Sequence, residues 1–293
     1  MKVSYLIVGV AALFMASCSN GADNGATAGQ KASSMEVASS AGASDGISNF
    51  EVRQTFKNVA RNYNVTAATG DNDWLKDAGV SASVAVQWPD KLGDVDLSAM
   101  QDSIVSMVAD TTAYGRDIDK AMMAYVSSPD GTRGCTLARI DSVPVAPKIA
   151  AQTTVSFKVL TRRLAVVERA FYSYQGGAHG NYGSRFINFD LSTGKALGYD
   201  AIFKAGTADS VRQALTEALL ARYNVSKVSD LDNCGIFSAN LFVTRNLWLD
   251  GDDIVFYYNI YEIAPYAAGP IEVRVPAWKV ESLLTPAAAA ILL

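Results

Sequence analysis

The pattern of apolar and polar positions along the chain predicts a series of β-strands. Between residues 80 and 88, Val84, Val86 and Trp88 share one face, and small or polar side chains occupy the other. This period of two is typical of a half-buried strand, which Pro89 is expected to end. Alternation, or a run of β-branched and aromatic residues, predicts further strands over residues 155–159, 164–174, 185–190, 241–249, 254–260 and 271–275.

Other segments have helical periodicity. Residues 100–108 carry apolar side chains at helical spacing, and residues 98–101, from Ser98 to Gln101, have the form of a capping box. The same period predicts helices over residues 118–126 and 211–224, and a short helix led by Pro276.

Strands that follow one another through turns, with few helices between them, indicate an α+β fold. We predict antiparallel β-sheets with a few packed helices, in two consecutive subdomains at residues 50–150 and 151–285. The apolar residues 286–293 are too few to span a bilayer, so we expect them to dock on the body of the protein.

The first residues have the pattern of an export signal. Lys2 precedes an apolar run over residues 5–14, and small residues then lead to Cys18. This order is typical of a secretory signal, and the cysteine at its end makes it look like a bacterial lipoprotein signal. We expect residues 1–17 to be removed and Cys18 to be lipidated. The alternatives are an ordinary secretory signal and an uncleaved anchor.

Residues 18–49 form the predicted connection between the lipid and the folded part. They are almost wholly Gly, Ala, Ser, Asn and Asp, a composition that cannot bury enough surface to order itself. A flexible tether of this length has a root-mean-square reach of about 30 Å. The predicted location is therefore the cell envelope, extracytoplasmic and lipid-anchored.

Composition narrows the class of partner. Hydrophobic residues make up 49% of the chain and charged residues 18%, as in a folded domain with a sizeable core. Loss of Lys2 with the signal leaves 24 basic and 29 acidic residues, a net charge of 24 − 29 = −5. Because nucleic-acid binding needs clustered Lys and Arg, and no such cluster is present in the sequence, we expect no nucleic-acid partner.

Two cysteines besides Cys18 remain. Cys135 and Cys234 both lie beside a glycine, which suggests loops. In an oxidising compartment they can form a disulfide, or they can be two separate small core residues. The sequence leaves both alternatives open.

One glycine-rich segment stands out between two predicted strands. Residues 172–183 contain four glycines and His179, the single histidine of the chain. Such a loop needs unusual dihedral angles or a close backbone approach. A second aromatic loop follows at residues 261–270.

These segments together resemble the RsiV/PdaC-type extracytoplasmic domain, a domain-of-unknown-function family. The resemblance covers residues 155–284 and rests on Tyr174 with Gly-Gly-Ala-His-Gly, Asn188-Phe189-Asp190 with Thr193-Gly194-Lys195, and Tyr261-Glu262-Ile263-Ala264-Pro265-Tyr266 with Gly269. It implies a binding or sensing module at the cell surface. In one family member the domain belongs to an anti-sigma factor and binds lysozyme, and in another it accompanies a peptidoglycan deacetylase domain. We expect neither a sigma-binding part nor a deacetylase domain in this chain.

The candidate site follows from these two loops. On the functional interpretation, aromatic faces and a few polar groups form a site suited to sugar rings or a protein surface. Its predicted residues are Tyr172, Tyr174, Gly176, Gly177, His179, Asn181, Tyr182, Tyr261 and Tyr266. On the structural interpretation, His179 only pins the loop and the tyrosines belong to the core.

Catalysis is a weaker interpretation of the same histidine. Ser173 or Ser184 can be written as a triad with His179 and Asp190, but a triad is recognised by geometry. The sequence contains no Gly-x-Ser-x-Gly elbow. One histidine and separated cysteines do not give zinc spacing, so we expect no metal and no cofactor.

The preferred hypothesis is a lipid-anchored cell-envelope protein with a non-catalytic binding module. Its partners would be the membrane, through the N-terminal lipid, and a lysozyme-like protein or a cell-wall glycan such as peptidoglycan. The alternatives are a small envelope hydrolase that uses His179 and a structural envelope lipoprotein without a small ligand.

Overall fold

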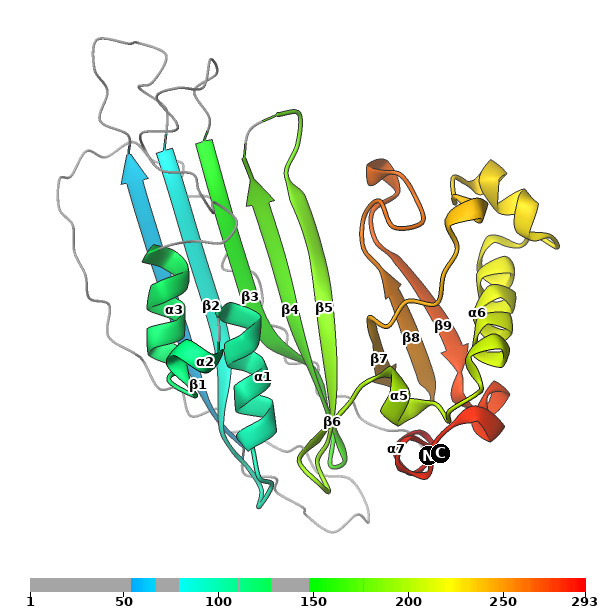
Figure 1. Cartoon of the computed structure of the whole chain (residues 1–293), viewed down its shortest axis with the longest axis horizontal. Coiled ribbons are helices and arrows are strands. Elements are labelled where there is room, and N and C mark those ends of the chain that lie inside the picture. The colour runs from blue at the N-terminus through cyan, green and yellow to red at the C-terminus, as the bar shows by residue number, and fades with distance from the viewer. Residues whose placement is uncertain (1–53, 67–78, 110, 128–147, 176) are drawn as a thin grey trace, which may run out of the picture.

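The structure is a computed structural model that describes residues 54–66, 79–109, 111–127, 148–175 and 177–293 (Figure 1). The predicted signal peptide, Cys18, the tether, Cys135 and Gly176 lie outside the described residues.

The larger of two sheets contains six strands in sequential order. Its strands are β1 (Gln54–Thr66), β2 (Gly79–Leu92), β3 (Lys148–Leu160), β4 (Leu164–Tyr174), β5 (Asn181–Asp190) and β6 (Lys195–Leu197). Neighbouring strands pair antiparallel except β2 and β3, which are parallel. A parallel pair needs a crossover connection, and the segment between β2 and β3 carries helices.

Strands are present at the predicted places, with corrections in detail. β2 does not end at Pro89 but continues to Leu92, because the pairing with β1 shifts register between Thr55 and Phe56, opposite the proline. A proline, which has no N–H to donate, is tolerated at such an irregularity.

The second correction concerns the alternation along β3. Its register against β4 shifts between Phe157 and Val159. Val155 and Phe157 therefore pack in one hydrophobic cluster and Val159 packs in the other. A local bulge of this kind changes the face on which the following side chains lie.

Three helices in the described part of the β2–β3 connection cover one face of the first strands (Figure 1). They are α1 (Ser98–Val108), α2 (Thr111–Tyr114) and α3 (Ile118–Ser127). Met100, Ile104 and Met122 are fully buried and join a cluster that includes Val84 and Val86 of β2. The apolar periodicity of residues 100–108 and 118–126 is thus explained by packing on the sheet.

The predicted capping box is wrong. The N–H of Gln101 bonds the carbonyl of Leu97 at 2.8 Å and not the Ser98 side chain, and Ser98 donates its own backbone N–H to the carboxylate of Asp96 at 3.0 Å. The side-chain amide of Gln101 donates to the carbonyl of Pro89 at 3.0 Å instead of turning back on its own helix. Tertiary contact with β2 therefore overrides the local motif.

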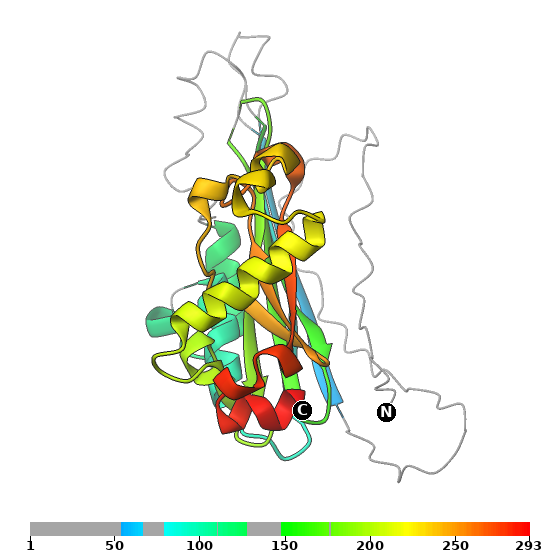
Figure 2. The same ribbon diagram turned by 90° about the vertical axis from the view of Figure 1, so that its right-hand side faces the viewer.

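The second sheet is smaller and lies beside β5 (Figure 1). Its antiparallel strands are β7 (Leu247–Asp250), β8 (Asp253–Tyr258) and β9 (Ile271–Pro276). Figure 2 shows helix α6 (Ala208–Tyr223) crossing the outer side of this sheet. The predicted end of α6 is confirmed by Asn224, which takes the left-handed conformation at φ 52°.

Short helices complete this half of the molecule. They are α5 (Tyr199–Ile202), α7 (Pro286–Leu292) and the 3₁₀ turns η3 (Val228–Cys234), η4 (Ser238–Asn240), η5 (Tyr266–Ala268), η6 (Ala277–Lys279) and η7 (Glu281–Leu283). In α7, the Thr285 hydroxyl caps the first turn, and Ala288 and Leu292 are buried against the body. None of the helices in the described part of the chain combines the length and hydrophobicity needed to cross a membrane.

The prediction of a long strand at residues 241–249 is only partly right, since β7 begins at Leu247. The preceding residues leave the sheet because Asn246 reaches across to β5. Its amide oxygen accepts the N–H of Phe186 at 3.0 Å, and its amide nitrogen donates to the carbonyl of Ser184 at 2.8 Å.

Two more asparagines complete this junction between the sheets. Asn259 Oδ1 accepts the N–H of Ser184 at 2.8 Å. In the opposite direction, the side chain of Asn188 bonds the backbone of Leu247 and Leu249 in β7 at 3.1 and 2.9 Å. The asparagines thus replace the strand partners that the facing edges of β5 and β7 lack, which buried backbone groups require.

The fold is α+β with two sheet subdomains, as predicted. The subdomains share one hydrophobic cluster, in which Val166 and Phe186 of the large sheet meet Trp248 and Phe256 of the small one. The predicted domain boundary at residues 150–151 falls inside β3, within the continuous six-stranded sheet.

Candidate functional site

The β4–β5 hairpin brings the first aromatic residues together. Tyr172 in β4 lies directly opposite Tyr182 in β5. The Tyr174 hydroxyl donates to the carbonyl of Gly177 at 2.9 Å, which closes the loop. Gly177 has φ 99°, a conformation that side chains rarely adopt, so a glycine is required there.

Gly180 is needed for a different reason. A Cβ atom at this position would stand 2.6 Å from Cζ of the Tyr172 ring, far inside van der Waals contact. The Tyr172 ring therefore lies directly on the loop backbone, and 37% of its surface remains exposed. These two requirements explain the glycines at positions 177 and 180 of the motif.

His179 connects the hairpin to the second sheet. Its Nδ1 lies 3.0 Å from the carbonyl oxygen of Gly180, and its Nε2 lies 3.1 Å from the hydroxyl of Tyr261. A carbonyl only accepts, so Nδ1 carries a proton and donates it to Gly180, and a second hydrogen bond joins Nε2 and the Tyr261 hydroxyl. The ring also stacks on Tyr266, with centroids 3.8 Å apart and planes inclined by 23°.

Tyr266 is the centre of the aromatic cluster. Tyr182 meets its ring edge-on with centroids 5.7 Å apart, and Tyr261 lies at the same centroid distance. Desolvation raises the pKa of the Tyr266 hydroxyl, and the neighbouring Tyr182, Tyr172 and Tyr261 raise it further. The side chains that act on this hydroxyl are phenols.

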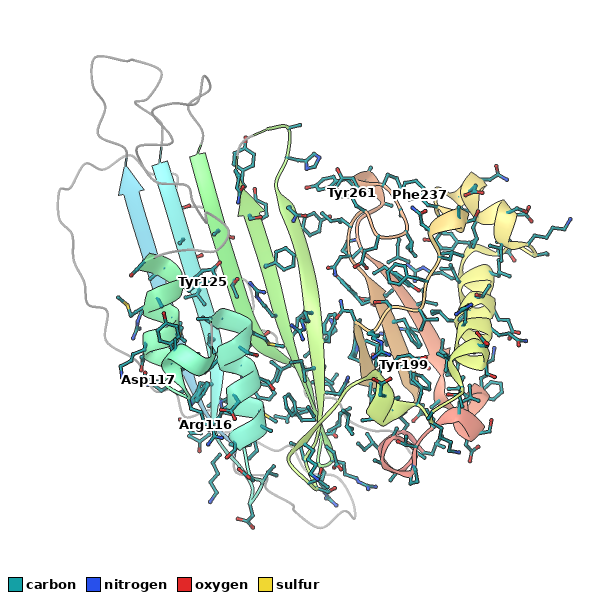
Figure 3. All side chains as sticks on the ribbon, viewed as in Figure 1. Arg116, Asp117, Tyr125, Tyr199, Phe237 and Tyr261 are labelled. Carbon is teal, nitrogen blue, oxygen red and sulfur yellow. The ribbon has the colours of Figure 1, made fainter. Side chains whose placement is uncertain are left out.

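Tyr261 has an unusual backbone. Its φ is 67°, in the left-handed region, which is rare for a bulky residue. Its side chain is 54% exposed. The loop is held by Asn259, whose N–H donates to Glu262 Oε2 at 2.8 Å while its side chain bonds β5. Figure 3 shows Tyr261 at the end of the small sheet that faces the hairpin tip.

The structure therefore brings together most of the predicted site residues. Those in contact through the hairpin and the second loop are Tyr172, Tyr174, Gly177, His179, Tyr182, Tyr261 and Tyr266. Asn181 is exposed at the start of β5, opposite Ser173.

The serine–histidine–aspartate arrangement is not assembled. Ser184 donates its hydroxyl to Glu168 at 2.7 Å. Asp190 lies at the other end of β5, a strand that spans about 30 Å from Asn181. Burial opposes ionisation of Asp190, but hydrogen bonds from Ser192 and Thr193 outweigh it and hold the pKa of this carboxyl below its usual range. Asp190 thus stabilises the turn after β5.

Sequence reasoning missed two residues next to the site. Asn259 anchors the Tyr261 loop to β5, as described above. Phe237 is 39% exposed, and its N–H donates to the carbonyl of Ile263 at 2.8 Å, which places it beside the same loop (Figure 3). A lone asparagine after a strand and an isolated phenylalanine carry no pattern that predicts these positions.

The structure does not decide between a disulfide and two separate cysteines. Cys234 is exposed at the end of η3, and Cys135 lies outside the described residues. Among the residues that the structure describes, no three His, Cys, Asp or Glu side chains are grouped to hold a metal ion.

Comparison with known structures identifies the fold. A DUF3298-family protein from Bacteroides fragilis matches with a TM-score of 0.64 and 22% identity, over 82% of this chain and 98% of that one. A DUF3298-family protein from Pseudomonas aeruginosa matches with a TM-score of 0.57 and 15% identity, over 80% and 96% of the two chains.

Curated relatives match a shorter part. The immunogenic protein MPT64 of Mycobacterium tuberculosis is 28% identical over 114 residues, 39% of this chain and 49% of its own length. An esterase of the same organism, Rv3036c, is 27% identical over 108 residues, 36% and 46% of the two chains. The matches thus span about half the length of these relatives.

The family comparison covers the second sheet and its helix. Residues 200–277 match the family described as a protein of unknown function (DUF3298). This segment includes the Tyr261 loop, whereas the hairpin with His179 precedes it. Residues 200–277 therefore carry the DUF3298 signature, and the chain has the fold of two solved proteins of that family.

Proposed function

We propose that this chain is a lipid-anchored, extracytoplasmic envelope protein whose aromatic cluster binds a cell-wall glycan or a lysozyme-like protein. The export signal with Cys18 supports the anchor. The observation that carries the binding role is the exposed cluster around His179, in which residues from segments about 80 positions apart meet through the 3.1 Å contact with Tyr261. No reaction is part of the proposal.

The cluster has the features of a binding surface. Tyr172 and Tyr261 are among the large apolar side chains that remain exposed. Exposed aromatic rings with polar tips supply contact area and hydrogen bonds at a low cost in side-chain entropy. Since three of the rings contact one another or His179, they present a surface that is fixed before a ligand arrives.

The test is a titration of the full-length chain in detergent with soluble peptidoglycan fragments and with a lysozyme. We expect saturable binding of one of them, weakened in His179→Ala because Tyr261 and Tyr266 lose their common partner. Gln213→Ala is the control, since Gln213 is an exposed residue of α6 whose side-chain amide donates to its helix neighbour Glu217. Absence of binding to both probes, or equal binding by His179→Ala, would contradict the proposal.

An ester hydrolase is the second candidate, because one partial relative is named an esterase. The hydrogen bonds of His179 run to Tyr261 and Gly180, and Ser184 is bonded to Glu168. The geometry therefore favours binding. Hydrolysis of p-nitrophenyl butyrate by the wild type that is abolished in His179→Ala or Ser184→Ala, in folded variants, would favour the enzyme instead.

A further inference from the structure

We infer that Tyr261 is the stacking platform for a neutral sugar ring, and that His179 is the positioning residue that holds this platform. The inference rests on the proposed binding function and names the class of ligand. Three independent features of Tyr261 carry it: its backbone, its fixed hydroxyl and the chemistry around its ring.

The first feature is a costly backbone conformation at an exposed aromatic residue. The left-handed φ of 67° disfavours a residue with a Cβ, and glycine would fit without strain. Yet more than half of the Tyr261 side chain, 54%, is exposed, so burial in the core does not explain why a tyrosine is kept there. Strained residues of this kind gather at ligand-binding sites.

The second feature is that the ring is held at both ends. The loop backbone fixes the Cα end, because Asn259 bonds Glu262 within the loop and Ser184 in β5. His179 Nε2 fixes the hydroxyl end at 3.1 Å. His179 itself is held by Gly180 and by the ring of Tyr266. A ring fixed in this way loses little freedom on binding.

The third feature is the chemistry of the side chains that form the cluster. They are tyrosines and one histidine, and none of them is Lys, Arg, Asp or Glu. The nearby carboxylate of Glu262 accepts a hydrogen bond from the N–H of Asn259. An anionic polymer would need Lys or Arg at this place. A pyranose ring instead presents an apolar C–H face to an aromatic ring and hydroxyls to phenolic partners.

The experiment is calorimetric titration of the full-length chain in detergent with the tetrasaccharide of N-acetylglucosamine, a neutral probe. In Tyr261→Gly we expect affinity to fall about tenfold, the loss of one aromatic contact, while the melting temperature stays equal or rises. Trp278→Ala is the control, because Trp278 is a 67% exposed aromatic residue outside the cluster.

A double-mutant cycle tests the positioning role. Tyr261→Phe and His179→Ala each remove the bond between the two side chains, so the double variant should bind no more weakly than the weaker of the single variants. Because Tyr261→Phe retains an aromatic ring, the cycle also tests the positioning role if Tyr261→Gly does not fold. Additive losses would overturn the positioning role.

The other outcomes separate the inference from the proposed function. Binding of peptidoglycan fragments without binding of the neutral tetrasaccharide would overturn the ligand class and leave the function standing. Binding of lysozyme alone would also overturn the ligand class and leave the function standing, with a protein as the partner. Unchanged tetrasaccharide affinity in Tyr261→Gly, or an equal loss in Trp278→Ala, would overturn the stacking platform. No binding of any probe would overturn both.

Discussion

Single glycines decide whether the aromatic cluster can form. Gly183 lies in β5 with Asn259 Oδ1 and the Phe171 ring against it, so there is no room for a Cβ. At Gly180 the Tyr172 ring lies on the backbone, and at Gly177 the backbone has a positive φ. Each glycine of the described motif thus has a physical reason of its own, and the reasons are steric rather than chemical.

We predict that Gly183→Ala pushes Asn259 away from β5 and costs about 1–3 kcal/mol, because the N–H of Ser184 then loses its partner. Urea unfolding followed by circular dichroism measures the change. Gly198→Ala is the matched control, since no atom stands within 4 Å of a Cβ there, and we expect a change within about 0.5 kcal/mol. Equal stability of the two variants would show that Asn259 does not depend on Gly183.

At the scale of elements, the edges of β5 and β7 are the points where the two sheets meet. Side-chain amides of Asn188, Asn246 and Asn259 bond the backbone groups of the facing strand. Amide side chains have one donor group and one acceptor, so they can copy the pattern of a peptide bond. This arrangement fixes the position of the Tyr261 loop relative to the hairpin.

We predict that Asn246→Ala destabilises the protein by about 2–4 kcal/mol, because two backbone groups of β5 are left without partners. The free energy of unfolding in urea tests this. Gln213→Ala removes an exposed amide in α6 and should change the stability by no more than about 0.5 kcal/mol. If Asn246→Ala also loses no more than about 0.5 kcal/mol, water makes the hydrogen bonds of the missing asparagine, and the prediction is wrong.

At the scale of the whole molecule, an aromatic cluster lies where the two sheets meet. Tyr257 lies 8% exposed among Phe186 and Trp248, with ring centroids at 5.1 and 6.0 Å. Burial raises the pKa of Tyr257 to about 12. The neutral phenol is thus the form that the folded state requires.

This shift predicts loss of stability in alkali. Well below pH 10 the phenol is neutral in both states, and between pH 10 and about 12 ionisation is mainly that of the unfolded state, so the free energy of unfolding falls by about 2 kcal/mol. Tyr257→Phe should lose less over this range when unfolding is measured at each pH. Burial also raises the pKa of Tyr258, so part of the alkaline loss should remain in the variant. Equal slopes for the two proteins would contradict the prediction.

Local patterns determined most of the elements and the membership of the site. The strand over residues 164–174 and the helix ending at Asn224 were predictable because period and turn chemistry act within a few residues. The resemblance at the two aromatic loops also indicated most of the residues that meet around His179. The sequence alone could not show whether these residues touch one another.

Tertiary structure decided what depends on distant partners. The side chain of Gln101 in helix α1 bonds the carbonyl of Pro89 in β2 instead of completing a capping box. Asn246 shortens β7 because it bonds β5 about 60 residues away in sequence. The left-handed backbone of Tyr261, its bond to His179 and the separation of Asp190 arise in the same way. Periodicity reports which face of an element is apolar, whereas contacts between side chains and remote backbone groups leave no periodic trace, so only the folded chain defines them.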